Sequence, residues 1–114
     1  MIRNVTKNKV LARKAGFRSN FLSQGIGLML RKKYDFIDRG LIFIFYIENI
    51  KHIHTFFMLF NIDILFLDKN KRVSKIYRNV RPWRLNIAGK GRYVVELVAG
   101  NVKNTEVGDR ISFK

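Results

Sequence analysis

The sequence predicts a small, mostly β domain of the α+β class, with a barrel-like sheet and one helix. Its apolar segments are short runs rich in Ile, Val, Phe and Tyr, bounded by Gly, Asn and Asp, which is typical of strands. Apolar residues near helical spacing occur only over residues 20–32. The 114 residues are 47% hydrophobic, enough for one core and a single domain over residues 1–114. Closing the sheet into a barrel would remove its edges.

The first half of the chain is expected to hold two short strands, a helix and a buried strand. Residues 2–5 and 9–15 alternate polar and apolar side chains around a TKN turn, as half-exposed strands do. The helix over residues 20–32 starts at polar capping residues and ends at cations, which favour the negative end of a helix dipole. The segment LIFIFYI, residues 41–47, predicts a strand buried on both faces.

The second half predicts further strands over residues 52–59, 62–68, 72–79, 93–100 and 110–114. A hairpin turn at DKNK joins the second and third of these strands. Residues 80–92 are expected to form a loop, whose AGKGRY segment resembles a phosphate-binding loop only by its glycines. Residues 101–106 fit either a turn or a short helix.

Charge is the outlying property of the composition. Lys and Arg number 23 against 8 Asp and Glu, a formal net charge of +15. Such a field attracts nucleic acid or anionic surfaces. Abundant Ile, Lys and Arg are also typical of proteins from hot or AT-rich genomes, so part of the charge can be background. The absence of Cys excludes a disulfide scaffold, a thiolate metal site and a cysteine nucleophile.

The cellular location predicted from the sequence is the cytoplasm, with no membrane partner. The N-terminal residues alternate basic and apolar side chains and lack the continuous apolar core of a secretory signal. The most apolar segments are shorter than the roughly 20 residues that a bilayer-spanning helix requires.

Six ordered motifs extend over most of the chain. They are GLMLRKK, GLIFIF, IHTFFMLFNIDILFLDKNKRV, RPWR, YVVELVAG and VGDRI. In order and spacing they resemble the family catalogued as domain of unknown function 192, from about Leu11 to the C-terminus. The resemblance implies a small, mostly β domain found in bacteria and archaea, with no agreed substrate, cofactor or catalytic residue.

The chain departs from the pattern of this family at two positions. Asn61 stands where family members usually carry Pro, and Gln24 stands where they often carry Arg. The Asn61 side chain can still form the turn. The absence of Arg at position 24 weakens any role in which that cation would pair with a buried acid.

Asp63 interrupts an otherwise apolar run. A buried carboxylate must be paired or hydrogen-bonded, so Asp63 fits a structural acid that holds a loop or a neighbouring strand. The alternative is a small-molecule, metal-binding or enzymatic pocket around His54, Asp63 and Glu96, lined by the region of Met29 and Met58.

The two histidines allow a metal-binding interpretation as well. His52 and His54 are two residues apart, so in a strand their rings would project from one face. The pair is therefore a weak candidate for a metal site. A hydrogen bond between His54 and Asp63 in a core is the simpler interpretation. Thr55 has no nucleophile elbow around it. We therefore assign no catalytic residue and no cofactor; the sequence favours binding over catalysis but leaves enzymatic activity open.

The basic segment, defined as residues 69–92, carries nine cations and no acid. Its candidate polyanion contacts are Lys75, Arg78, Arg81, Trp83 and Arg84, and Tyr77 is a second candidate for stacking on bases. The function predicted from this segment is a small basic domain that binds nucleic acid, RNA more than DNA because no groove-reading helix is evident. Two different functions also fit the sequence: ligand binding or catalysis in the pocket around Asp63, and docking on a protein partner as an accessory subunit.

Overall fold

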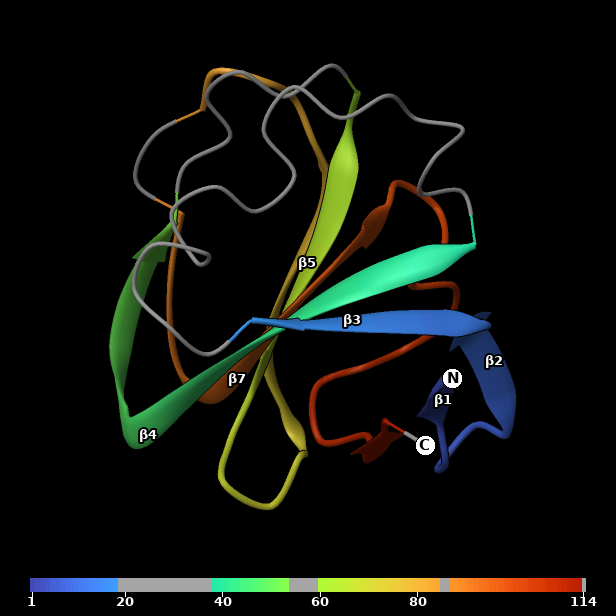
Figure 1. Cartoon of the computed structure of the whole chain (residues 1–114), viewed down its shortest axis with the longest axis horizontal. Coiled ribbons are helices and arrows are strands. Elements are labelled where there is room, and N and C mark those ends of the chain that lie inside the picture. Colours follow the sequence, from blue (N-terminus) through green and yellow to red (C-terminus); the bar gives the residue numbers. More distant parts are fainter. Residues whose placement is uncertain (19–37, 54–59, 85–86, 114) are drawn as a thin grey trace.

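The computed structural model describes residues 1–18, 38–53, 60–84 and 87–113 (Figure 1). These residues form eight strands: β1 (Ile2–Asn4), β2 (Lys9–Ala12), β3 (Lys14–Arg18), β4 (Arg39–Ile53), β5 (Ile62–Leu67), β6 (Val73–Val80), β7 (Ile87–Val98) and β8 (Ile111–Ser112). The described residues contain no helix. The mostly β class that the sequence predicts is therefore confirmed.

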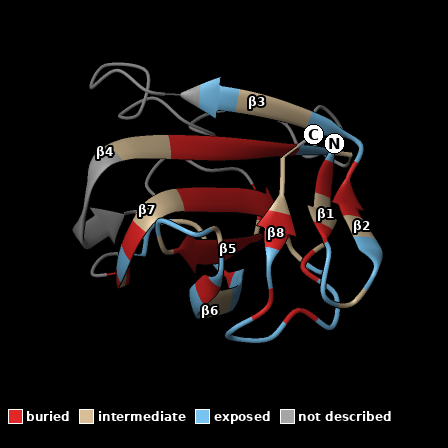
Figure 2. Ribbon diagram, turned by 90° about the horizontal axis from the view of Figure 1, so that it is seen from below, coloured by how far each residue is buried: buried red, intermediate tan, exposed pale blue. Residues whose placement is uncertain are grey.

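The strands form two sheets. The larger sheet has the order β3-β4-β7-β5-β6, and the smaller sheet has the order β2-β1-β8. Only β3 and β4 run parallel, and every other neighbouring pair is antiparallel. Figure 2 shows the smaller sheet at one end of the larger one, close to both chain termini.

Apolar side chains pack on both faces of the larger sheet. On one face, Ile42, Leu65 and Leu97 meet Ile2 and Leu11 of the smaller sheet. The opposite face carries its own buried cluster, which includes Leu41, Phe43, Ile64, Phe66 and Val94. Because β5 lies between β7 and β6 and all six of its residues are buried, its sequence is nearly continuously apolar.

The larger sheet is open, so the prediction of a closed barrel is wrong. Within the described residues, β3 and β6 each have a neighbour on one side only. The edge strand β6 carries exposed cations and a break in its pairing register with β5, where Asn79 has a φ of 52°. Charges and bulges on an edge strand oppose pairing with another strand, so the edge stays stable without closure.

The two predicted helices have different outcomes. Residues 20–32 lie outside the described residues. Residues 101–106 form turns, because the N–H groups of Gly100 and Val102 donate to the Asp63 carboxylate and not to helical carbonyls. Gly100 and Lys103 also have φ values of 94° and 55°, which a right-handed helix does not allow. Among the described residues, no helix is long and apolar enough to cross a bilayer.

The predicted loop over residues 80–92 is wrong from Ile87 onward, because β7 begins there. Its glycines allow close packing. A Cβ atom at Gly89 would lie 2.5 Å from Cγ of Phe66, and one at Gly91 would lie 2.8 Å from the carbonyl oxygen of Leu67. The separate strand predicted over residues 52–59 also differs from the structure, because residues 52 and 53 belong to β4, which ends at Ile53. Residues 54–59 lie outside the described residues.

Candidate functional site

Asp63 is buried and accepts three backbone hydrogen bonds. Its Oδ1 accepts from the N–H of Asn79 at 2.8 Å. Its Oδ2 accepts from the N–H groups of Gly100 at 2.8 Å and Val102 at 3.2 Å. The side chain is 1% exposed and so ties the irregular end of β6 to the turn after β7. This geometry supports the structural interpretation of the acid.

Glu96 lies among apolar side chains on the central strand β7. It is paired with Leu41 on β4 and with Ile64 on β5, and it is 5% exposed. Burial raises the pKa of Glu96 to about 8. Within the described part of the chain, no hydrogen bond to its carboxyl group is present, so the group is mainly protonated at neutral pH.

The structure does not bring Asp63 and Glu96 into one pocket. Asp63 is paired with Leu97 and Ile64 is paired with Glu96, so the two carboxyl groups project from opposite faces of the larger sheet. The third member of the predicted pocket, His54, lies outside the described residues, as do Met29 and Met58.

The weak metal prediction rested on His52 and His54. The backbone of His52 lies in β4, in register with Ala88 of β7, and nothing further is described for the pair. Among residues 1–18, 38–53, 60–84 and 87–113, no three His, Asp or Glu side chains are grouped as metal ligands.

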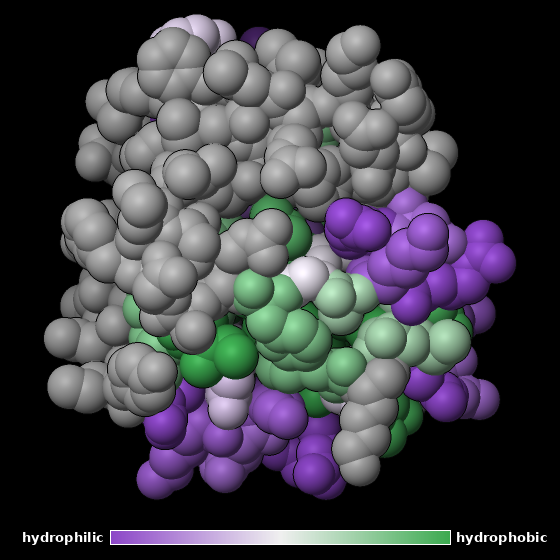
Figure 3. All heavy atoms as spheres, in the orientation of Figure 1, coloured by the Kyte–Doolittle hydropathy of each residue, from purple (hydrophilic) through white to green (hydrophobic). Residues whose placement is uncertain are grey.

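All five of the predicted polyanion contacts are exposed, Arg78 included. Lys75 lies on the edge strand β6, and Arg81 and Arg84 flank the turn that follows it. Trp83 in this turn is 59% exposed and has a φ of 65°. Figure 3 shows hydrophilic residues gathered at the lower and right margins of one face, beside a central apolar area.

Arg78 and Tyr77 have structural contacts. The Arg78 guanidinium donates to the carbonyl oxygens of Lys103 and Thr105, both at 2.7 Å. The Tyr77 hydroxyl donates to the carbonyl oxygen of Ala88 at 2.7 Å, and its ring packs edge-on against Phe66. Both side chains therefore hold neighbouring segments in place, although Arg78 is also exposed.

Two cations lie over the Tyr77 ring. The Lys75 Nζ atom lies 4.9 Å from the ring centroid, and the Arg84 Cζ atom lies 5.5 Å from it. Such cation–π contacts position both side chains at the surface. Lys75 and Arg84 are thereby gathered over one aromatic ring, although they come from different segments.

The model of the family domain of unknown function 192, described as "Uncharacterized ACR", matches residues 3–113 of this chain. The chain belongs to this family.

Relatives and solved structures agree with this assignment. The UPF0127 protein of Pyrococcus abyssi is 36% identical over 118 residues, which is 99% of this chain and 97% of the relative. The UPF0127 protein of Thermococcus sibiricus is 34% identical over 119 residues, covering 100% and 75% of the two chains.

Two crystal structures share the fold. A protein from Sinorhizobium meliloti is 25% identical with a TM-score of 0.80, over 86% of this chain and 79% of that one. A protein of unknown function from Novosphingobium aromaticivorans has a TM-score of 0.82 at 19% identity, over 98% and 81% of the two chains.

The departure of this family member at Asn61 has a structural explanation. The Asn61 side-chain amide donates to Oδ1 of Asn79 at 2.9 Å, and the backbone carbonyl oxygen of Asn61 accepts from the N–H of Ala99 at 3.1 Å. Both contacts join the same two segments that Asp63 holds. The second departure, Gln24, lies outside the described residues.

Sequence reasoning missed a buried network around Asp109. Asn4 donates to Thr105 at 3.0 Å and to Asp109 at 2.8 Å, and Lys7 donates to Asp109 at 3.0 Å. Burial acts to raise the pKa of Asp109, but hydrogen bonds from Asn4, from the backbone N–H of Glu106 and from Lys7 outweigh it and hold the pKa below its ordinary value. These partners are far apart in the sequence, so no local pattern indicates the network.

Proposed function

We propose that this domain of unknown function 192 protein binds single-stranded nucleic acid, RNA in preference to DNA, through Lys75, Arg81, Trp83 and Arg84. The observation that carries the proposal is the exposed ring of Trp83. It is 59% exposed, and its backbone has a φ of 65°, which costs energy for a bulky side chain. An exposed aromatic side chain on strained backbone is typical of a binding site.

The chemistry of the surrounding side chains fits a polyanion. Arg and Lys contact phosphates, and each base stacked on an aromatic ring contributes about 1–3 kcal/mol. Arg81 and Arg84 lie on either side of Trp83 in the sequence, and Lys75 lies beside Arg84 over the same ring. Phosphate contacts on both sides of a stacking ring suit an extended strand.

One observation favours a single strand over a duplex, and a second favours nucleic acid over other polyanions. The described residues contain no helix that could enter the major groove of a duplex, whereas the exposed ring of Trp83 in the turn after β6 can stack on unpaired bases. The Sinorhizobium meliloti protein of the same fold is described as a candidate transcription regulator, a class that acts on nucleic acid.

The test measures binding of fluorescent single-stranded RNA by the variant Lys75→Gln/Arg81→Gln/Arg84→Gln. We expect weaker binding and a shallower dependence of log K on log salt, by about 2, since each lost phosphate contact removes about 0.7 from the slope for a single strand. Single-stranded DNA of the same sequence should bind more weakly than RNA. Arg78 is left unchanged because its guanidinium supports the fold.

The matched control removes three cations from other strands, with the variant Lys9→Gln/Lys14→Gln/Arg39→Gln. These exposed residues lie on β2, β3 and β4. Its binding should stay within twofold of the wild-type protein. If both variants lose the same affinity, the binding reflects net charge alone and the proposal is wrong.

A further inference from the structure

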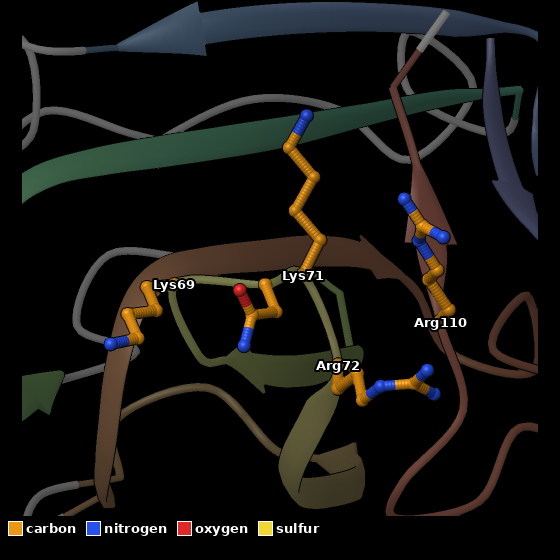
Figure 4. Close-up of a pocket in the computed structure, with 5 residues that line it drawn as sticks. Lys69, Lys71, Arg72 and Arg110 are labelled. Atoms are coloured by element: carbon orange, nitrogen blue, oxygen red, sulfur yellow. The ribbon is translucent and has the colours of Figure 1, made fainter.

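A pocket lies where the turn between β5 and β6 meets the segment that leads into β8. It has a volume of about 470 Å³ and is lined by Lys69, Asn70, Lys71, Arg72 and Arg110 (Figure 4). Its lining therefore contains four cations, one amide and no carboxylate. A volume of this size is within the range of small-molecule sites, about 300–1,000 Å³.

The two arginines of this pocket stand at directly opposed positions on neighbouring backbone segments. Arg72 and Arg110 form an antiparallel bridge pair, an arrangement in which like charges directly opposite are destabilising. Figure 4 shows both guanidinium groups at one end of the pocket and the Lys69 ammonium at the other. An anion between the two guanidinium groups would remove their repulsion.

Within the described residues, the contacts of Arg72 and Lys71 in this pocket are with uncharged groups. Arg72 donates through Nη1 to the carbonyl oxygen of Gly108 at 3.2 Å, a neutral acceptor. The Lys71 Nζ atom lies 4.8 Å from the ring centroid of Phe113, also an uncharged contact. Within the part of the chain that the structure describes, the Arg110 guanidinium has no ion pair.

The backbone beneath the cations is fixed before any ligand binds. The Asp68 carboxylate accepts from the N–H groups of Asn70 at 2.8 Å and Arg72 at 3.0 Å, so it faces the backbone of the turn. The carbonyl oxygen of Lys71 accepts from the N–H of Ile111 at 2.9 Å, which joins the turn to β8. A preorganised site loses less conformational entropy on binding.

We infer that this pocket binds a phosphate group carrying two negative charges, as in a phosphomonoester. Arginine pairs are suited to phosphate because the guanidinium donates two parallel hydrogen bonds to its oxygens. The inference is independent of the proposed nucleic-acid surface, since it requires neither Trp83 nor Arg81. A terminal phosphate can come from a free phosphorylated molecule or from the end of an oligonucleotide, and the chemistry at the pocket is the same.

The experiment measures the thermal midpoint of the full chain with sodium phosphate and with sodium chloride at equal ionic strength. Phosphate should raise the midpoint more than chloride does, because a ligand that binds only the folded state stabilises it. Arg110→Gln should reduce the affinity for phosphate at least tenfold, whereas Arg39→Gln, an exposed cation on β4, should not. Without phosphate and at low salt, Arg110→Gln should be at least as stable as the wild-type protein, because the opposed charges are gone.

Two further titrations identify the source of the phosphate. Competition by adenosine 5′-monophosphate but not by adenosine assigns the pocket to a free phosphomonoester. Competition only by an oligonucleotide with a 5′-phosphate, and not by its 5′-hydroxyl form, assigns it to a strand end. Equal effects of phosphate and chloride, or equal phosphate affinity in the wild-type protein and Arg110→Gln, would overturn the inference.

Discussion

Asp63 and Glu96 lie on adjacent strands of the same sheet, one register position apart, with their carboxyl groups on opposite faces. Asp63 meets three backbone N–H groups, whereas Glu96 is surrounded by apolar neighbours. The first arrangement stabilises a carboxylate and the second stabilises a neutral acid. Two buried acids in one core therefore have opposite physical roles.

Asp63→Asn should lower the free energy of unfolding by roughly 2–4 kcal/mol. The amide replaces one acceptor oxygen with a donor, which then faces a backbone N–H group of Asn79, Gly100 or Val102. Urea denaturation measures the loss. Asp38→Asn is the control, because Asp38 forms a surface ion pair with Arg13 and such pairs contribute about 0–1 kcal/mol. Unchanged stability in Asp63→Asn would contradict the structural role.

The free energy of unfolding should fall as the pH rises from 4.5 to about 8, because of Glu96. Below this interval the acid is protonated in both states. Within it, the unfolded chain loses the proton while the folded protein keeps it, which lowers stability by up to about 1.4 kcal/mol per pH unit.

The difference between wild type and Glu96→Gln, measured by urea denaturation at several pH values, isolates this effect. Glu106→Gln, whose side chain is 72% exposed, should leave the dependence unchanged. If the free energy of unfolding falls equally with pH in Glu96→Gln and in the wild-type protein, Glu96 is not the cause of the fall.

Gly89→Ala should destabilise the fold by about 1–3 kcal/mol, the usual cost of overpacking a core. The added Cβ would lie 2.5 Å from Cγ of Phe66, whose ring is fully buried and has little room to move. Thermal unfolding followed by circular dichroism measures the change. Lys90→Ala, at the adjacent exposed position on β7, is the matched control. Equal midpoints for the two variants would show that β7 and Phe66 are not packed this closely.

Arg78→Gln should reduce stability without reducing the RNA affinity of the folded protein. Its guanidinium donates to the carbonyl oxygens of Lys103 and Thr105, so its removal leaves two acceptors without their donor. Chemical denaturation and RNA binding at a temperature where the variant is folded separate these effects. A loss of RNA affinity in the folded variant, with stability intact, would place Arg78 in the binding surface instead.

Local sequence patterns predict β5 and β6 well but not the contacts between distant segments. The bounds predicted for β5 and β6 match the structure to within one residue at each end, although the burial of β6 does not alternate. The start of β7 was missed because glycines are typical of loops, and here Gly89 is required by a Phe66 ring that lies on another strand. The turns over residues 101–106 depend on Asp63, which is also distant in the sequence.

The same reasoning explains what was missed in the candidate sites. A run of cations is visible in the sequence, so Lys75, Arg81 and Arg84 are found at once. The sequence does not show that Arg78 is bound to backbone carbonyls. It also does not show that Arg110 faces Arg72, because the bridge forms only after β8 reaches the β5–β6 turn.

The most direct test of the proposed function is the fluorescence of Trp83, the single tryptophan of the chain. A single-stranded oligouridine is titrated at about 150 mM salt, a concentration that weakens purely electrostatic binding. We predict saturable quenching of the Trp83 emission, because a stacked base contacts the indole ring, and weaker quenching in Lys75→Gln/Arg81→Gln/Arg84→Gln. RNA that binds by anisotropy while the Trp83 emission stays unchanged, or RNA that does not bind at this salt concentration, would contradict the account.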